Sequence, residues 1–497
     1  LRAPAVSLPY ASPDGAARGT VTVQGDATLA NDTLWQGGVR AVGLALSAGL
    51  FWALFAISLF AHARMGLQVV IEDYVHHRAA ELALQVLVLF ACAMYRAPHT
   101  GDAQSYWELA LYCAQNHTFY PSPRDEFALY IFGNGYVNLL SLLLRLRETY
   151  AWVYAVNMAF TQLLVFSVYR IMRRLCEGRE AACAAVTLLC LLPALWGEAA
   201  SSRTELCFMG LAFASLACAM EDGTGWHALS GVLMALCNWV RPLMVILLPM
   251  TLLLLILRKK RLRCIAAYLL GAAAVIATIG QATKNLSGHF VYQAQTMGVN
   301  MLMGNNDDAD GSYDNAVFGE GKIGYISEDE RGVTYRVRDA FYKRQAVDWI
   351  VRHIPRFVQL IPRKLFYFLS TDTYGGTPYL GGGTETDNLP YLLSLRDVLL
   401  GRGERGFAFG DAVVIFSQLI YMAVLALFAL DIVSAFRRGT WARMLPFWGI
   451  FALACGIAVL TVGAPRYHMP YLPIFAMGAG DYLLAGRGGS AEPDEAI

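Results

Sequence analysis

Charged residues are scarce in this chain. Asp, Glu, Lys and Arg make up 15% of the 497 residues, whereas hydrophobic residues make up 56%. A typical soluble domain carries about 25% charged residues. The scarcity of charge therefore excludes an ordinary soluble protein and indicates that lipid solvates much of the molecule.

Several chemical motifs are also missing. The sequence has no phosphate-binding P-loop, no Ser–His–Asp elbow and no paired Cys/His spacing for zinc. Nine of the ten cysteines lie in or beside apolar runs and only Cys113 falls in a polar loop, so no disulfide framework is expected. No internal repeat occurs, and the inverted-repeat signature of many transporters is therefore absent.

Eleven apolar runs are candidates for membrane spans, which need roughly 20 helical residues each. The run 228–257 contains Arg241-Pro242, and a proline there predicts either one kinked helix or a broken pair. The candidate spans are 41–62, 79–95, 150–172, 181–200, 205–221, 228–241, 243–257, 264–282, 409–433, 445–462 and 470–486.

Three short basic loops predict the orientation, because Lys and Arg are enriched in cytoplasmic loops. The basic residues are Arg170, Arg173, Arg174 and Arg179, then Arg258, Lys259, Lys260, Arg261 and Arg263, then Arg437, Arg438 and Arg443. With these loops and the C-terminus inside, the polar segments 96–149 and 283–408 fall outside.

The sequence therefore predicts an all-α polytopic membrane protein with four parts. A polar segment at 1–40 has no apolar core and no signal-peptide pattern. An N-terminal transmembrane module at 41–282 contains the first outer loop, 96–149. An outer α/loop region at 283–408 precedes a C-terminal transmembrane module at 409–497.

Amphipathic patterns in the two outer segments predict juxtamembrane helices. Tyr106, Leu109, Ala110 and Cys113 recur at helical spacing. The run 134–146 is apolar but short, which favours an interfacial helix over a span. Residues 338–370 show helical patterns broken by Pro355 and Pro362.

Asp102 is the first candidate for chemistry, in the run APHTGDAQSYWELA just outside a span. A carboxylate at a membrane boundary can accept a proton from an incoming hydroxyl or amine, which is general-base catalysis. The structural alternative is a helix N-cap, because Gly-Asp before an amphipathic helix is a typical helix start.

Two further motifs place basic residues at the outer ends of spans. Arg203 and Glu205 in SSRTELCF either bind an anionic headgroup or form a structural ion pair. Arg241 in NWVRPLM, at the helix break, either holds a phosphate bidentately or snorkels to the interface.

A third motif, APRYHMPYLP, lies between the last two spans. Arg466, Tyr467 and His468 are candidates for substrate binding there, and the alternative is an interfacial anchor of aromatic and basic residues.

The Asp-rich run NNDDADGSYD resembles the first half of a calcium loop. Asn306, Asp308, Asp310 and Gly311 fit, but Val317 occupies the position of the bidentate Glu. A turn built by Asn, Asp and Gly is the better interpretation.

In order along the chain, these stretches resemble the GT-C glycosyltransferases, the polyprenyl-phosphate-sugar enzymes typified by protein O-mannosyltransferases and the lipid A aminoarabinose transferase. The stretches are GDAQSYWELA with GYVNLLSLLLRL, SSRTELCF, NWVRPLM, GNNDDADGSY and APRYHMPYLPIF. Together these stretches span roughly residues 79–486. Each stretch is short, so the specificity of the resemblance comes from their order along the chain. The resemblance implies a GT-C-type bundle of about 11 transmembrane helices.

The resemblance also implies roles for particular residues. The family's catalytic acid in the first outer loop maps onto Asp102, and its phosphate-binding basic residues map onto Arg203, Arg241 and Arg466. Several relatives have two adjacent acids where this chain has Asp102 followed by Ala103, which argues against a metal-binding pair. A second carboxylate from the same loop would come from Asp125 or Glu126.

The expected function is that of an inverting glycosyltransferase of a bacterial inner membrane, acting at its outer face. The expected partners are a polyprenyl-phosphate sugar donor, a glycan, lipid or protein acceptor, and membrane lipids, but no nucleic acid. The leaving group is already a good one, so no cofactor is required and a divalent cation has no support. The rival functions are an O-antigen ligase or polymerase and a lipid or solute transporter, which would carry its functional charges near mid-membrane.

Overall fold

The computed structural model describes residues 6–11, 18–23, 101–119, 132–176, 179–199, 201–326, 335–372, 388–402, 406–407 and 409–484. The chain divides into two compact units, residues 1–82 and residues 83–497. In the first unit, β1 (Val6–Ala11) pairs antiparallel with β2 (Arg18–Val23). This hairpin departs from the all-α prediction. Alternating β-branched residues in Thr20–Val23 favour the extended conformation, and the short runs carry no span signal that would reveal them.

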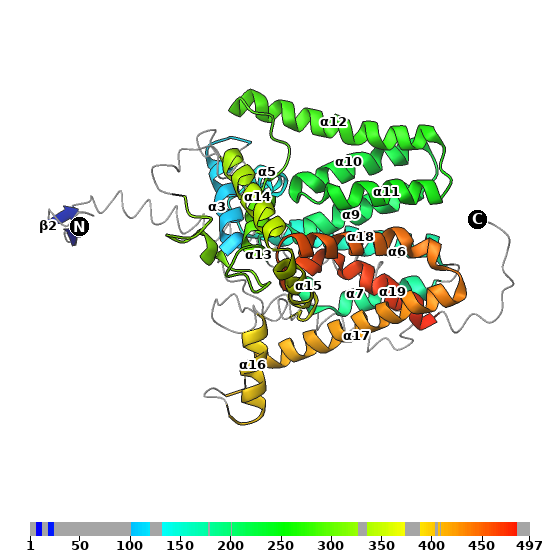
Figure 1. Ribbon diagram of the computed structural model, residues 1–497. Helices are drawn as coiled ribbons and strands as arrows, with labels where there is room; N and C mark the ends of the chain where they lie inside the picture. Colours follow the sequence, from blue (N-terminus) through cyan, green and yellow to red (C-terminus); the bar gives the residue numbers. More distant parts are fainter. Residues whose placement is uncertain are drawn as a thin grey trace. The chain divides into compact units, whose positions relative to one another are not determined.

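The described residues of the second unit form helices joined by turns and loops, with no strand among them (Figure 1). Its long or bundle-forming helices are α6 (Ala151–Leu175), α7 (Glu180–Leu191), α8 (Pro193–Ala199), α9 (Glu205–Met220), α10 (Thr224–Val240), α11 (Met244–Leu257), α12 (Leu262–Ser287), α17 (Phe409–Arg438), α18 (Trp441–Leu460) and α19 (Leu472–Leu484). The others are α3 (Gly101–Gln115), α5 (Asn134–Leu144), α13 (Met297–Gly304), η1 (Asn315–Phe318), α14 (Tyr335–Arg352), α15 (Ile354–Leu369), α16 (Asn388–Leu399) and η4 (Pro465–Tyr471).

Four of these helices are long and apolar enough to cross a membrane: α6, α12, α17 and α18. The bent pair α7–α8 makes up to five, with a 61° change of direction. The chain is therefore an integral membrane protein, but the predicted eleven spans are not confirmed.

The shortfall in the span count has two causes. The runs 205–221, 228–241, 243–257 and 470–486 form helices of 16, 17, 14 and 13 residues, α9, α10, α11 and α19. A 14-residue helix is about 21 Å long, which is shorter than a hydrocarbon core of about 30 Å. The runs 41–62 and 79–95 lie outside the described residues.

The run 228–257 forms a broken pair of helices. Helix α10 ends at Val240 and α11 begins at Met244, so Arg241, Pro242 and Leu243 form the link. Lys260, just after α11, donates to the carbonyl of Glu221, just before α10, at 3.0 Å. The two helices therefore run antiparallel, with Arg241 at the tip of a helical hairpin.

The three predicted basic loops meet at one end of the bundle. Arg258 donates to the carbonyl of Arg174 at 2.9 Å, and Arg443 to that of Leu175 at 3.4 Å. Arg443 also pairs with Asp481 at 2.6 Å. We call this the basic end of the molecule.

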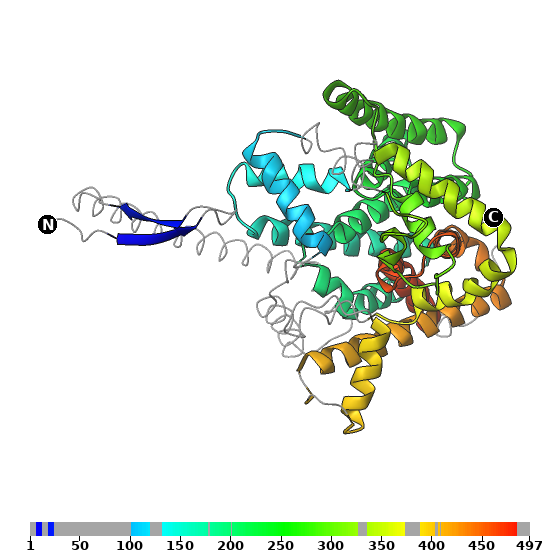
Figure 2. The same ribbon diagram turned by 60° about the vertical axis from the view of Figure 1, so that its left-hand side comes forward.

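The opposite end is covered by helices that cross the bundle direction. Figure 2, in which this end is turned toward the reader, shows α3 and α14 lying across the ends of the bundle helices. Helix α3 packs on α5, and a Cβ built at Gly133, before α5, would lie 1.9 Å from the carbonyl oxygen of Val240. Glycine is therefore required where α5 approaches the tip of the α10–α11 hairpin.

Candidate functional site

Asp102 lies in the first turn of α3, at the end of the bundle opposite the basic end. Its carboxylate pairs with the guanidinium of Arg466, and its side chain is 55% exposed. Ser202 fixes this turn by donating to the carbonyl of Ala103 at 2.6 Å. Asp102 is the second residue of α3, and its ion pair joins this helix to η4.

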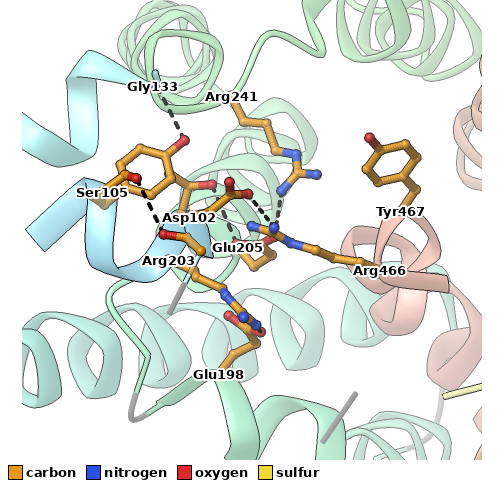
Figure 3. Close-up of polar contacts among 12 residues, drawn as sticks. Asp102, Ser105, Gly133, Glu198, Arg203, Glu205, Arg241, Arg466 and Tyr467 are labelled. Atoms are coloured by element: carbon orange, nitrogen blue, oxygen red, sulfur yellow. Dashed lines mark hydrogen bonds and ion pairs between the residues drawn. The ribbon is translucent and has the colours of Figure 1, made fainter. Parts of the chain in front are cut away.

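Glu205 joins two of the predicted arginines. It is completely buried at the start of α9, and its Oε1 accepts from Arg466 Nε and, at 2.8 Å, from Arg241 Nη1 (Figure 3). A buried carboxylate is costly without partners, and two guanidinium groups compensate the charge of Glu205. Because both donate to the same oxygen, Glu205 also fixes their positions relative to each other.

Asp102, Glu205, Arg241 and Arg466 therefore form one charged cluster, drawn together from four elements. Asp102 comes from α3, Glu205 from α9, Arg241 from the α10–α11 link and Arg466 from η4. Arg241 has an extended backbone at the helix break, and its side chain reaches Glu205 on α9. The sequence left open whether Glu205 binds a headgroup or forms an ion pair, and in the structure it is buried and pairs with Arg241 and Arg466.

Arg203 makes a neighbouring ion pair. Its Nη1 donates to Oε1 of Glu198 at 3.0 Å, and Figure 3 shows this pair below Glu205. The prediction left open whether Arg203 or Arg241 acts with Arg466. The geometry groups Arg241 with Arg466 on the same carboxylate, and it groups Arg203 with Glu198.

Tyr467 and Tyr106 line the cluster. The Tyr467 hydroxyl donates to Asn300 Oδ1 at 3.3 Å, which connects η4 to α13. The Tyr106 hydroxyl accepts from the backbone N–H of Gly133 at 3.3 Å. Burial, followed by the charge of Asp102, raises the pKa of Tyr106, so this phenol is neutral.

His468, also a candidate for substrate binding, contacts α15 and α17. It is buried, and its Nδ1 forms a hydrogen bond with the carbonyl oxygen of Phe368 at 2.8 Å. Its ring stacks on the ring of Tyr421, with the two ring centroids 4.7 Å apart. Burial lowers its pKa to about 4, so the ring carries no charge near neutral pH. The tight 3-10 turn of η4 directs Arg466 and His468 to different neighbours, and His468 caps the end of α15.

The remaining predicted residues fall into two groups. Asp125 and Glu126 lie outside the described residues. In the Asp-rich run, Asp308 pairs with Lys322 at 2.6 Å, and Asp310 accepts from the backbone N–H of Ser312 at 2.8 Å. These contacts agree with the turn interpretation. Among the described residues, no group of three or more His, Cys, Asp and Glu side chains is placed to hold a metal ion.

A small apolar pocket is lined by residues that lie one or two helical turns further along the chain than the residues of the charged cluster. Its lining includes Phe208 and Ala212 from α9, Leu243 from the α10–α11 link and Tyr471 from η4. Phe208 follows Glu205 by three residues, Leu243 follows Arg241 by two, and Tyr471 follows Arg466 by five. The same elements therefore supply charged groups and, deeper in the bundle, an apolar lining.

Two contributors were missed by the sequence prediction. Glu198 is a lone acid at the end of an apolar run, a signal that the rule for ionisable residues in membrane segments would have found. Asn300 gave no such signal, because a single Asn in an outer segment is unremarkable in sequence.

The arrangement combines a half-exposed carboxylate with two arginines held by a buried acid. Arginine pairs of this kind bind phosphate through parallel charge-assisted hydrogen bonds. An exposed carboxylate next to them can remove a proton from a nucleophile. The charged cluster can therefore hold a phosphate and deprotonate an acceptor within one site.

No protein-family model matches the sequence, and no curated protein matches it. Among solved structures, the chain is similar to the archaeal oligosaccharyltransferase AglB from Archaeoglobus fulgidus, solved in complex with an inhibitory peptide and a dolichol-phosphate. The identity is 14% and the TM-score 0.38, and the match covers 85% of this chain and 53% of that one. The chain thus spans about half the length of that relative, and a similarity this distant identifies neither its family nor its activity.

Proposed function

We propose that the chain is an inverting glycosyltransferase that uses a polyprenyl-phosphate sugar as donor. The observation that supports this function best is the bridging position of Arg466, between the half-exposed Asp102 and the buried Glu205. A phosphate-binding group and a candidate base are thereby adjacent at the end of an apolar bundle.

In this proposal the donor phosphate binds Arg466 and Arg241. Arg466 exchanges its bond with Asp102 for bonds to the phosphate, while Glu205 keeps both guanidinium groups in place. The isoprenoid tail extends along the apolar helices on the side of Phe208 and Leu243. The two arginines stabilise the negative charge that develops on the leaving phosphate, which is the transition-state role of such groups.

Asp102, released from Arg466, takes the proton of an acceptor hydroxyl or amine. The acceptor atom attacks the anomeric carbon and forms the new glycosidic bond as the bond from carbon to phosphate oxygen breaks. The configuration inverts, the proton stays on Asp102, and polyprenyl phosphate leaves. The acceptor is a lipid-linked glycan, an envelope polysaccharide or a protein, and the reaction takes place at the end opposite the basic loops.

Replacing Asp102 with Asn tests this assignment. The donor is first identified by mass spectrometry of lipids that co-purify with the chain, and transfer is then measured in nanodiscs. Because general-base catalysis contributes about 10²–10⁴-fold, Asp102→Asn should lower kcat by that factor. Polyprenyl phosphate should still bind the variant.

The matched control is Glu108→Gln, on the same helix. Glu108 is exposed and accepts a local bond from Gln104, one helical turn away, at 2.6 Å, so its loss should leave kcat unchanged. Wild-type turnover by the Asp102→Asn variant would show that Asp102 is not the base.

A further inference from the structure

Helix α15 carries an apolar face that its contacts with the protein leave exposed. Ile354, Val358 and Phe366 are 57%, 54% and 52% exposed, and Pro362 between them is exposed as well. These four residues follow one another at four-residue steps, so they share one side of the helix. We call them the apolar line of α15.

The apolar line lies opposite the side of α15 that is packed on the bundle. Leu360, Lys364 and Phe368 are buried at the same four-residue spacing, offset by two residues from the apolar line. At about 100° per residue, two residues correspond to about 200° around the helix. The apolar line therefore faces away from the protein.

Two contacts give the depth of α15 along the bundle. Lys364 Nζ donates to the carbonyl of Val459 at 2.9 Å, and Val459 follows Trp441 by 18 residues in α18. The Tyr421 hydroxyl donates to the carbonyl of Leu369 at 2.7 Å, and Tyr421 precedes Arg437 by 16 residues in α17. At about 1.5 Å per residue, α15 lies about 27 Å and about 24 Å from the basic end, close to the thickness of a hydrocarbon core of about 30 Å.

The charges of α14 and α15 match a phospholipid surface. Apart from the buried Lys364, residues 335–370 contain seven Lys and Arg residues, against Asp339 and Asp348, so the pair of helices carries a net charge of +5. On α15, Arg356, Gln359 and Arg363 are exposed at three- and four-residue steps, on a side about 120° from the middle of the apolar line. A helix with this order of sides lies in the plane of a membrane, with its apolar side in the acyl boundary and its arginines among the headgroups.

We propose that α15 is an interfacial helix that inserts its apolar line into the outer edge of the bilayer and binds anionic lipid headgroups through Arg356 and Arg363. The lipid surface is favoured over a protein partner because the contacts with α17 and α18 fix α15 at the depth where those spans leave the hydrocarbon core. The inference does not depend on the proposed glycosyl transfer.

Nitroxide labels on single introduced cysteines test the insertion, with the full chain in nanodiscs. In Val358→Cys the label should collide with oxygen and be protected from a water-soluble nickel chelate. In the neighbouring control, Gln359→Cys, the preference should reverse. The unmodified chain, labelled in parallel, gives the background from its native cysteines.

Native mass spectrometry tests the lipid preference. The chain released from mixed neutral and anionic nanodiscs should retain anionic lipids, and the double variant Arg356→Gln/Arg363→Gln should retain at least twofold fewer. Equal access of the nickel chelate to positions 358 and 359 would overturn the inference. Protection of position 358 from both reagents would do so too, because it would indicate a covering protein surface.

Discussion

Glu205 determines where two arginines lie. Its burial removes water as a competitor, so its single Oε1 acceptor holds the guanidinium groups of Arg241 and Arg466 against the cost of desolvation. Arg203 has a carboxylate of its own, Glu198. In the sequence, Arg203, Arg241 and Arg466 look alike, because each lies at the start or end of an apolar run. In the structure their carboxylate partners differ.

This difference predicts unequal effects of removing the arginines. Arg241→Gln should weaken binding of polyprenyl phosphate about 10- to 100-fold, because a hydrogen bond to a charged group contributes about 1.5–3 kcal/mol. Arg203→Gln should weaken it less than about threefold, since its guanidinium serves Glu198. Titration of each variant in nanodiscs with polyprenyl phosphate measures both, and unfolding midpoints separate lost binding from lost folding. Equal losses in the two variants would contradict the grouping of Arg241 with Arg466.

At the scale of elements, α15 is attached to the bundle by polar groups. His468, Tyr421 and Gln418 bond to the carbonyls of Phe368, Leu369 and Ser370, which α15 leaves without helical partners at its C-terminus. Near the middle of the helix, Lys364 donates to Asn305 Oδ1 at 2.8 Å as well as to Val459. These bonds fix the helix that approaches the membrane surface.

Lys364 predicts a pH dependence of stability. Burial lowers the pKa of its amine from 10.5 to about 7. Between about pH 7 and pH 10.5 the unfolded chain binds a proton that the folded chain lacks, so the free energy of unfolding rises with pH in this window. The contribution is on the order of 5 kcal/mol.

Unfolding midpoints of the detergent-solubilised chain at several pH values between 7 and 10 check this prediction. Lys364→Met should show a smaller rise than the wild-type chain, whatever its absolute stability. Parallel curves for the two proteins would mean that the amine titrates as it does in water.

Element types were largely predictable from sequence, and their lengths were not. Long apolar runs located α6, α12, α17 and α18, but hydropathy alone could not decide that 228–257 folds back at Arg241-Pro242. Whether the run folds back depends on the bond from Lys260 to the carbonyl of Glu221 and on the packing of α5 against Val240. Both are contacts between segments distant in sequence. The same limit applies to His468, whose neighbours Phe368 and Tyr421 lie far away in sequence.

At the scale of the whole molecule, the charges separate into two ends. Arg174, Arg258 and Arg443 are linked at the basic end, whereas Asp102, Arg241 and Arg466 meet at the other. Basic loops are retained in the cytoplasm. The candidate site is therefore expected on the non-cytoplasmic side.

Labelling from one side of a membrane checks the orientation. In right-side-out vesicles, a membrane-impermeant maleimide should label Gln104→Cys directly and Arg261→Cys only after permeabilisation; both positions are exposed. The chain without added cysteine measures the background. Labelling of Arg261→Cys in sealed vesicles would reverse the proposed topology.

The positions of the charged cluster could be predicted, but their meeting could not. Asp102 and Arg466 were identifiable because each is a charge beside an apolar run. The two residues are 364 positions apart, and no local pattern specifies such a contact.

That separation has a consequence for biosynthesis. Translation adds Arg466 364 residues after Asp102, so a nascent chain carries the carboxylate over that length without the guanidinium that pairs with it. Glu205 likewise lacks its second arginine partner until Arg466 has been made. Asp102 and Glu205 are both paired only when η4 brings Arg466 to them, so a chain that ends before η4 cannot assemble the site.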